Sequence, residues 1–270
     1  MSKSKQYVVM TIAGLDPSGG AGIIADVKTM MAFGCFPTAI VTALTFQNTT
    51  GVFGVRKQTA ADVIGQIMPV VDDFRISAVK TGMLPNGAII SAIAELVRSK
   101  KLPAPVVDPV VVSTSGHRLI SRAALVVLMR DLIPVARIVT PNIPEAELLS
   151  GLTIKSEDDR WAAAEKIGAM GARAVLVKGG HHHGRDALDI LWEQGKRTDF
   201  RSPWIKTRST HGTGCTLSAA IAAGLAHGKS MKVSVGEAKE YVHSAITNAP
   251  GLGKGNGPVD HAWQFRPSHK

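Results

Sequence analysis

The sequence has too few cysteines for a disulfide framework and too short an apolar run for a membrane helix. Its two cysteines, Cys35 and Cys215, lie far apart and form no CxxC metal motif. The best apolar stretch, residues 217–226, is Ala/Gly-rich and falls short of the roughly 18 to 20 residues of a membrane span. Asp16 and Pro17 interrupt the N-terminal apolar run before it could serve as a signal peptide. We therefore expect a cytoplasmic protein.

Aromatic residues are also scarce, at 5% of the 270 residues. The net charge of +10 suits nucleic acid or a phosphorylated small molecule, but the basic residues are scattered and little aromatic surface is available for base stacking. We expect no nucleic acid as the main partner. Hydrophobic residues reach 45% against 19% charged, which excludes disorder. No linker divides the chain, so residues 1–270 are expected to form a single domain with short flexible termini.

Short apolar segments alternate with amphipathic ones along the whole chain. The expected strands are residues 7–13, 38–45, 78–82, 106–108, 137–140 and 174–178, with a hairpin formed by 187–192 and 197–200. The expected helices are residues 23–33, 60–74, 86–101, 121–133, 144–149, 156–170, 212–227 and 234–248, with Asn86 and Ser156 as N-caps. This alternation predicts an α/β fold of three layers, with a mainly parallel sheet between helices.

Ligands of such sheets bind at the carboxyl ends of the strands. The loops to search are therefore residues 16–22, 45–51, 82–85, 108–116, 141–145 and 178–184. Residues 20–25 fit the dinucleotide pattern GxGxxA, but no acidic residue for the ribose follows between Asp26 and Asp62. Asp16 and Asp26 offer substrate binding as another interpretation of this turn. A Walker A loop fails because Val27 replaces its second glycine.

The turn at residues 211–216, His-Gly-Thr-Gly-Cys-Thr, carries the strongest local chemistry. Consecutive amides of Gly212, Thr213 and Gly214 at a helix start can bind a phosphate. The same helix end is expected to lower the pKa of Cys215, which could then act as base or nucleophile. Tight helix packing with a small core cysteine is the alternative.

Three further polar residues lie at or after the ends of predicted strands. Asp108 and Glu145 are candidate Mg²⁺ ligands, directly or through water, and Lys178 could reach a phosphate. Each could equally be an ordinary solvated loop residue. The run His181, His182 and His183 cannot converge on one ion from a single element, so we expect an exposed loop.

Together these motifs resemble the hydroxymethylpyrimidine and phosphomethylpyrimidine kinases of thiamine biosynthesis, in the ribokinase superfamily. The resemblance rests on residues 13–22 (AGLDPSGGAG), 47–49 (QNT), 108–110 (DPV), 140–142 (TPN), 144–146 (PEA), 178–181 (KGGH), 211–216 (HGTGCT) and 254–261 (KGNGPVDH). The chain departs from the family at Leu15, where Ser or Thr is common, at Ile24, commonly Gln, and at residues 113–116, commonly Ala-Lys-Ser-Gly.

The resemblance implies a ribokinase-like fold with a small lid-like strand element, ATP and Mg²⁺ as cofactors, and a homodimer. It implies that Gln47 hydrogen-bonds the aminopyrimidine, Asp26 helps to position it, and Met83 and Val110 pack on its ring. The residues it implies for the nucleotide are Asn142, Lys178, Gly180, Gly212 and Gly214. Cys215 stands where sugar-kinase relatives carry an aspartate base, with Lys178 and the Gly212, Thr213 and Gly214 turn completing the catalytic set.

Three rival functions remain open at this stage. Pyridoxal, like the pyrimidine, is a flat heteroaromatic ring with a primary hydroxyl, so a pyridoxal kinase is the nearest alternative. A basic nucleic-acid-binding protein and a Rossmann oxidoreductase are the others.

Overall fold

The computed structural model describes residues 6–111, 119–180 and 186–266, and nine of their strands form one sheet in the order β3-β2-β1-β4-β5-β6-β7-β8-β9. The parallel strands are β1 (Val8–Leu15), β2 (Phe36–Asn48), β4 (Ile76–Thr81), β5 (Val106–Val107), β6 (Ile138–Val139) and β7 (Ala174–Val177). The antiparallel strands are β3 (Gly51–Lys57), β8 (Asp186–Glu193) and β9 (Lys196–Pro203). The predicted α/β class with a mainly parallel sheet is confirmed.

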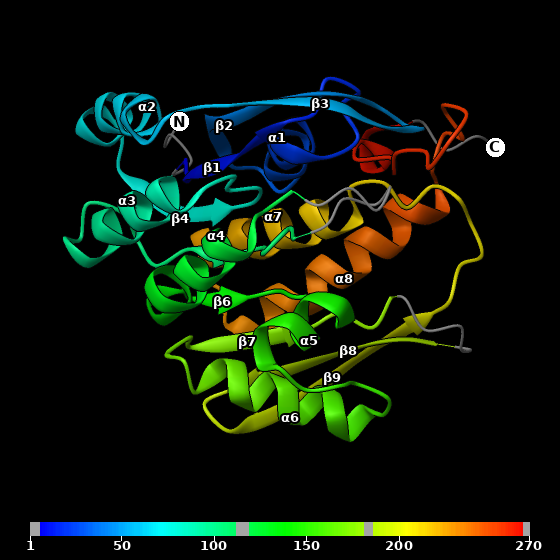
Figure 1. The fold of residues 1–270 in the computed structure, drawn as a ribbon. Helices are drawn as coiled ribbons and strands as arrows, with labels where there is room; N and C mark the ends of the chain where they lie inside the picture. The colour runs from blue at the N-terminus through cyan, green and yellow to red at the C-terminus, as the bar shows by residue number, and fades with distance from the viewer. Residues whose placement is uncertain (1–5, 112–118, 181–185, 267–270) are drawn as a thin grey trace, which may run out of the picture.

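Helices cover both faces of this sheet (Figure 1). One face carries α1 (Gly22–Ala32), α7 (Thr213–Ala226) and α8 (Met231–Thr247). The other carries α2 (Ala60–Asp73), α3 (Gly87–Arg98), α4 (Arg122–Val127), α5 (Ile143–Ser150) and α6 (Glu157–Gly168). The three layers expected from the alternating pattern are therefore present.

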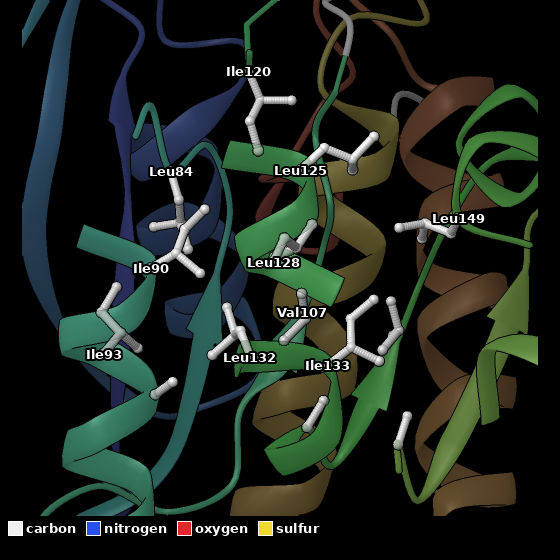
Figure 2. Packing of buried hydrophobic residues seen from close by; sticks show 14 of the residues in the cluster. Leu84, Ile90, Ile93, Val107, Ile120, Leu125, Leu128, Leu132, Ile133 and Leu149 are labelled. Atoms are coloured by element: carbon white, nitrogen blue, oxygen red, sulfur yellow. The ribbon is translucent and has the colours of Figure 1, made fainter. Parts of the chain in front are cut away.

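The two hydrophobic cores follow from the period of the strands. Successive strand side chains point to opposite faces, so Val106 joins the core under α7 while Val107 joins the core under α3 and α4. Figure 2 shows the second core, in which isoleucines and leucines of α3 and α4 interdigitate over Val107. Both faces of the central strands are buried, which is why these strands read as short continuous apolar runs.

Two elements differ from the prediction. The strand β3 was missed, because it lies at the edge of the sheet and its half-exposed side chains form no apolar run. The helix expected over 121–133 is α-helical only to Val127; a π-turn (Leu128–Leu132) and a 3-10 turn (Ile133–Val135) follow. Pro134 has no backbone N–H to continue the helix. The β8–β9 hairpin is confirmed, with Gln194 and Gly195 at φ +50° and +80° in its turn.

The strand order places the site. From β1 the chain runs outward to β2, and after β3 and α2 it returns to β4 on the other side of β1. A ligand crevice forms outside the carboxyl ends where the order reverses in this way. The loops after β1 and β4 therefore open beside one another.

Candidate active site

A cavity of about 610 Å³ lies at the carboxyl ends of the parallel strands. Each of the six loops expected to carry the site contributes to its wall. These contributions include Asp16, Gln47, Met83, Asp108, Asn142 and Lys178. The strand-end rule thus located the cavity from the sequence alone.

The start of α7 forms the floor of this cavity. Gly212 is its N-cap with φ +80°, and no side chain caps the helix. A Cβ on Gly212 would lie 1.8 Å from the carbonyl oxygen of Gly20, so only glycine fits between the two glycine-rich turns. Gly212, Thr213, Gly214 and Cys215 all line the cavity. The Thr213 amide donates to the Thr210 oxygen at 3.4 Å, and no side chain occupies the other amides of this turn. Such a helix start beside a cavity makes a site for an anionic group.

Asp16 ties the two glycine-rich turns together. Its carboxylate accepts hydrogen bonds from the amides of Ser18 (2.8 Å) and Ala21 (2.9 Å), and Nε2 of His211 lies 2.8 Å from its Oδ2. Burial acts to raise the pKa of Asp16, but hydrogen bonds from His211, Gln47 and Ser18 hold it well below its usual range. Asp16 is therefore an ionised anchor of the loop.

Lys178, Asp108 and Glu145 form a charged cluster on the wall. Nζ of Lys178 donates to Asp108 Oδ1 at 3.0 Å. Burial opposes the charge on Lys178, yet Asp108 and Glu145 hold its pKa above its ordinary value. Burial, with repulsion from Asp108, raises the pKa of Glu145. Two carboxylates against one ammonium leave the cluster with an excess of negative charge when both are ionised.

Asn142 and Glu145 also serve the fold. The Asn142 side chain accepts from the Glu145 amide, and Glu145 Oε2 accepts from the Asn142 amide, which is a capping box at the start of α5. The other oxygen, Oε1, accepts from the amide of Val111. Both residues line the cavity, but the Asn142 side-chain oxygen and both carboxylate oxygens of Glu145 already accept hydrogen bonds within the chain.

Cys215 lies on the cavity wall, but its expected low pKa is wrong. Burial raises the pKa of its thiol to about 11, with Asp26 and Asp108 adding to the effect. Lys80 and the amide of Gly22, which hydrogen-bonds to it, act in the opposite direction without balancing it. The helix end was visible in the sequence, whereas the two carboxylates come from distant segments. The thiol is therefore protonated at neutral pH in this structure.

Asp26 does not reach the cavity wall. Its side chain is fully buried and accepts two hydrogen bonds from Nζ of Lys80, at 2.9 and 2.8 Å, and one from Thr11 Oγ1 at 2.6 Å. A direct contact between Asp26 and a ligand is therefore not what the geometry offers. Lys80, which sequence reasoning missed, does line the cavity. A lysine inside an expected buried strand was the signal that could have identified it.

The cavity end beside β1, β2 and β4 is lined by Gln47, Met83 and Val110, as expected. Val110 has φ +44°, a strained conformation for a β-branched residue. Strain of this kind concentrates at functional sites, because the surrounding structure must hold it in place. The strained turn puts Val110 on the cavity wall two residues after Asp108.

The opposite end lies between the segment after β9 and α8. Its walls are largely apolar, with Trp204, Ile205, Val242 and Ile246. Gly180 opens onto the same cavity. The segment after β9 had no motif to identify it. The only earlier signal was the amphipathic pattern of α8.

Two sequence features fall outside the described residues. These are the run His181, His182 and His183, and the departure from the family at residues 113–116. Among the helices that are described, none is long and apolar enough to cross a membrane.

The sequence and the fold both have close counterparts among known proteins. Residues 16–260 match the family model for phosphomethylpyrimidine kinase. A hydroxymethylpyrimidine/phosphomethylpyrimidine kinase from Streptomyces coelicolor is 46% identical over 95% of this chain and 94% of that protein. One from Bacillus subtilis is 41% identical over 94% of each.

Solved structures agree with this. Phosphomethylpyrimidine kinase from Clostridium difficile 630 superposes with a TM-score of 0.79 at 40% identity, covering 89% of this chain and all of that one (100%). An ADP complex of Bacillus subtilis pyridoxal kinase superposes with a TM-score of 0.90 at 34% identity, covering 97% of this chain and 100% of that one. The start of α7, without a side-chain cap, lies at a cavity that Lys178, Asp108 and Glu145 also line, and the chain is a kinase that belongs to the phosphomethylpyrimidine kinase family.

Proposed function

We propose that the protein uses ATP to phosphorylate 4-amino-5-hydroxymethyl-2-methylpyrimidine, and then its monophosphate, to give the pyrophosphate used in thiamine biosynthesis. The observation that carries this proposal is one continuous cavity with an amide-bearing side chain at one end, an apolar slot at the other and the uncapped start of α7 between them. The hydroxymethylpyrimidine/phosphomethylpyrimidine kinases of Streptomyces coelicolor and Bacillus subtilis, to which the chain is similar, support the same substrate.

The acceptor is proposed to bind at the end lined by Gln47, Met83 and Val110. Gln47 offers a donor and an acceptor to the polar edge of an aminopyrimidine, and the two apolar residues suit the faces of its ring. Gln47 also contacts Asp16, which would fix its orientation. Asp26 contributes indirectly in this proposal, by holding Lys80.

The nucleotide is proposed to bind at the other end. The slot of Trp204, Ile205, Val242 and Ile246 suits a flat base, and Gly180 and Asn142 lie between it and the phosphate-binding turn. From there Lys178 and the amides of Gly212, Thr213 and Gly214 would bind the transferred phosphoryl group. An ATP-analogue complex of a structural neighbour, the pyridoxal kinase of Staphylococcus aureus, is consistent with this nucleotide.

Mg²⁺ fits the carboxylates beside Lys178. Among the described residues no group of three His, Cys, Asp or Glu side chains gathers to bind a metal alone. Kinases commonly hold Mg²⁺ by one or two carboxylates together with phosphates and water, and Asp108 with Glu145 meets that requirement. A bound ion would neutralise phosphate charge and remove the opposition of Asp108 to a negative sulfur on Cys215.

Cys215 is the proposed base for the attacking hydroxyl. It lies at the third position of α7, beside the turn that would hold the phosphoryl group. Because the thiol is protonated in this structure, it would have to lose its proton when substrate and Mg²⁺ bind. The hydroxyl proton would then pass to the negative sulfur as the oxygen bonds to phosphorus and the bond from phosphorus to ADP breaks. The turn and Lys178 would compensate the charge on the equatorial oxygens.

The direct test is ATP consumption with hydroxymethylpyrimidine, its monophosphate and pyridoxal under identical conditions. We expect the highest kcat/KM for the two pyrimidines. The alternative of a pyridoxal kinase is motivated by the TM-score of 0.90 to the Bacillus subtilis enzyme. A large kcat/KM preference for pyridoxal would replace the proposed substrate.

Gln47→Leu sharpens this test. The variant should lose pyrimidine recognition and keep ATP affinity, because a buried ring edge would lose its hydrogen-bond partner. If ATP affinity collapsed together with turnover, Gln47 would support the fold or the nucleotide site instead.

We also propose a homodimer. The edge strand β3 has unpaired backbone groups on one side and carries Phe53, 71% exposed, next to Phe46 of β2, 57% exposed. An open edge with apolar side chains favours pairing with a second copy. Sedimentation velocity of the parent and of Phe53→Lys should show a dimer in the first and a weakened dimer in the second.

A further inference from the structure

A buried ion pair lies beside the cavity, and the proposed reaction gives it no role so far. Lys80 on β4 and Asp26 on α1 are both fully buried, and Nζ of Lys80 donates to both carboxylate oxygens. Thr11 on β1 donates to the same carboxylate. Burial raises the pKa of Asp26, but Asp26 holds the pKa of Lys80 above its ordinary value, and the ammonium donates to both carboxylate oxygens of Asp26. We therefore treat the pair as ionised.

Stability does not account for this pair. Taking two charges out of water costs several kcal/mol per ion, so a buried ion pair can often be replaced by apolar side chains without loss of stability. The surrounding core offers such side chains, since Met10, Ile12 and Val79 of the same strands are fully buried. We therefore looked for a role of the Lys80 charge among the groups around its ammonium.

Lys80 lies between the core and the cavity. Of the three residues in the network, only Lys80 belongs to the cavity wall, together with Gly82. A Cβ on Gly82 would come within 2.8 Å of Nζ, so the glycine leaves space for the ammonium on that side. An ammonium has three N–H donors, and among the described residues its hydrogen bonds go only to Asp26.

Lys80 on β4 and Cys215 on α7 line the same cavity, and α7 packs against β4. The charged groups that act on the Cys215 sulfur are Lys80, which favours a negative charge there, and Asp26 and Asp108, which oppose it. Lys178 also interacts with Cys215. The amide of Gly22 hydrogen-bonds to the sulfur from the start of α1. Lys80 and Lys178 both line the cavity. Lys178 is hydrogen-bonded to Asp108, which also lines the cavity, whereas Lys80 is hydrogen-bonded to Asp26, which does not.

We propose that Lys80 is a positioning residue for the phosphoryl transfer: held by Asp26 and Thr11, it keeps a fixed positive charge beside Cys215 and stabilises the sulfur in its negative form. This inference rests on the proposed function, in which that sulfur takes the hydroxyl proton. The hydroxyl O–H bond breaks and an S–H bond forms, while the oxygen uses the freed electron pair to bond to phosphorus. The charge lost from the sulfur is carried off on the ADP leaving group.

The test removes the charge without leaving a buried partner unpaired. Lys80→Met alone should lower Tm, because Asp26 would be left alone in the core. Lys80→Met with Asp26→Asn removes both charges and keeps an acceptor for Thr11, so Tm should recover. The double variant should still show kcat lower by about tenfold or more, with KM for ATP within about threefold of the parent.

A second measurement is independent of activity. The rate of alkylation of Cys215 by iodoacetamide at one fixed pH reports how much of the sulfur is negative. Peptide mass mapping follows Cys215 and uses Cys35, which is 4% exposed and belongs to the core, as an internal reference. We expect the Cys215 rate to fall severalfold to about tenfold in the double variant, relative to Cys35. This result would hold even if the substrate assignment were wrong.

The matched control is the other buried Lys–Asp pair of the cavity. Lys239 Nζ lies 2.7 Å from Asp189 Oδ2, and Asp189 Oδ1 accepts from the amide of Gly179. Lys239→Met with Asp189→Asn removes this pair and keeps the acceptor for Gly179. Since Lys239 is not among the charges that act on Cys215, its alkylation rate should stay at the parental value.

Gly82→Ala provides a second route to the same answer. It keeps both charges and displaces the ammonium, so kcat and the Cys215 alkylation rate should both fall in a folded protein. A stable double variant with parental kcat and a parental alkylation rate would overturn the proposal, and so would a Gly82→Ala protein with both rates unchanged. In either case the pair would have only a structural role.

Discussion

The helices α5 and α7 both begin at the same cavity, but their first turns are built in opposite ways. At α5 the side chains of Asn142 and Glu145 satisfy one another's backbone amides. At α7 the N-cap is Gly212, whose left-handed conformation brings no side chain to the amides that follow. The first end is closed by its own sequence, and the second is left open to a ligand.

The remaining helices show that the open end is an exception. Side chains cap α2, α3, α4, α6 and α8 through Thr59, Asn86, Ser121, Ser156 and Ser230. Of the α-helices in the described part of the chain, α1 and α7 lack such a cap, and the first residues of both line the cavity. The amide of Gly22, at the start of α1, hydrogen-bonds to Cys215. Among the described α-helices, the two ends without a side-chain cap are thus both at the cavity.

Closing the open end should have the largest effect. Gly212→Ala would force a Cβ to within 1.8 Å of the Gly20 oxygen in a left-handed conformation, so the whole turn would move. Each lost donor of such a turn costs about 10²-fold, and several move together, so we expect kcat to fall by at least about 10⁴-fold. Steady-state kinetics with circular dichroism as the folding check would measure this.

Gly228→Ala is the matched control, at the other end of α7. Gly228 has φ +79° but no atom within 4 Å of an added Cβ. It should cost about 1 kcal/mol of strain and leave turnover near the parental value. Equal losses in both variants would mean that strain, and not the anion-binding turn, explains the result.

Cys215 tests whether the open end supplies a base as well as amides. Cys215→Ser should keep ATP affinity, because the backbone turn is unchanged, and lower kcat by about 10²- to 10⁴-fold. Cys215→Asp should recover part of that loss if a base is needed. Turnover of the serine variant within about threefold of the parent, under about 1 kcal/mol, would leave Cys215 with a packing role only.

The closed end is tested by Glu145→Gln. The amide keeps one oxygen for the capping box and removes the charge, but its NH₂ group replaces an oxygen that accepts from a backbone amide, so Tm should fall somewhat. The Mg²⁺ dependence is therefore measured on protein that circular dichroism shows to be folded. If Glu145 helps to hold the ion, the Mg²⁺ concentration for half-maximal activity should rise about tenfold. Asp62→Asn in the exposed capping box of α2 is the control and should leave the Mg²⁺ dependence unchanged. An unchanged Mg²⁺ dependence in Glu145→Gln would restrict that residue to capping.

These comparisons also show what the sequence could reveal. The caps Asn86 and Ser156, the latter in its capping box with Asp159, depend on residues three apart and were predicted correctly. The strand ends at Asp108 and Lys178 followed from the alternating pattern, whereas the first strand was predicted to end at Ala13 and runs to Leu15. Such local patterns need no knowledge of the tertiary structure.

The features that the sequence did not reveal depend on contacts between distant segments. The Lys80–Asp26 pair joins residues 54 apart in the sequence, and the charges around Cys215 come from β4, α1 and the loop after β5. The helix end led to the prediction of a lowered pKa for Cys215, but burial, which appears only once the chain is folded, raises that pKa. Similarly, Trp204 and Val242 line one end of the cavity without any motif in common.

The smallest effect on turnover at neutral pH is expected at the hydrogen bonds of Thr216 and His261, which hold the first turn of α7. Thr216, in the first turn of α7, donates through Oγ1 to the Gly212 oxygen, and Nε2 of His261 lies 3.1 Å from the same hydroxyl. Since that hydroxyl donates elsewhere, His261 Nε2–H is the donor to it. Burial, helped by Lys28, lowers the pKa of His261 from 6.5 to about 4.

This shift has a definite sign for stability. Below pH 6.5 the unfolded chain binds a proton at His261 that the folded chain refuses until about pH 4, so stability falls as pH drops across that window. The loss should reach about 3 kcal/mol at pH 4, with full stability above pH 6.5. His261→Gln keeps a donor for Thr216 and removes the titration, so its Tm should depend less on pH between 6.5 and 4. Parallel Tm curves for the two proteins over that window would show that His261 is not the group that titrates.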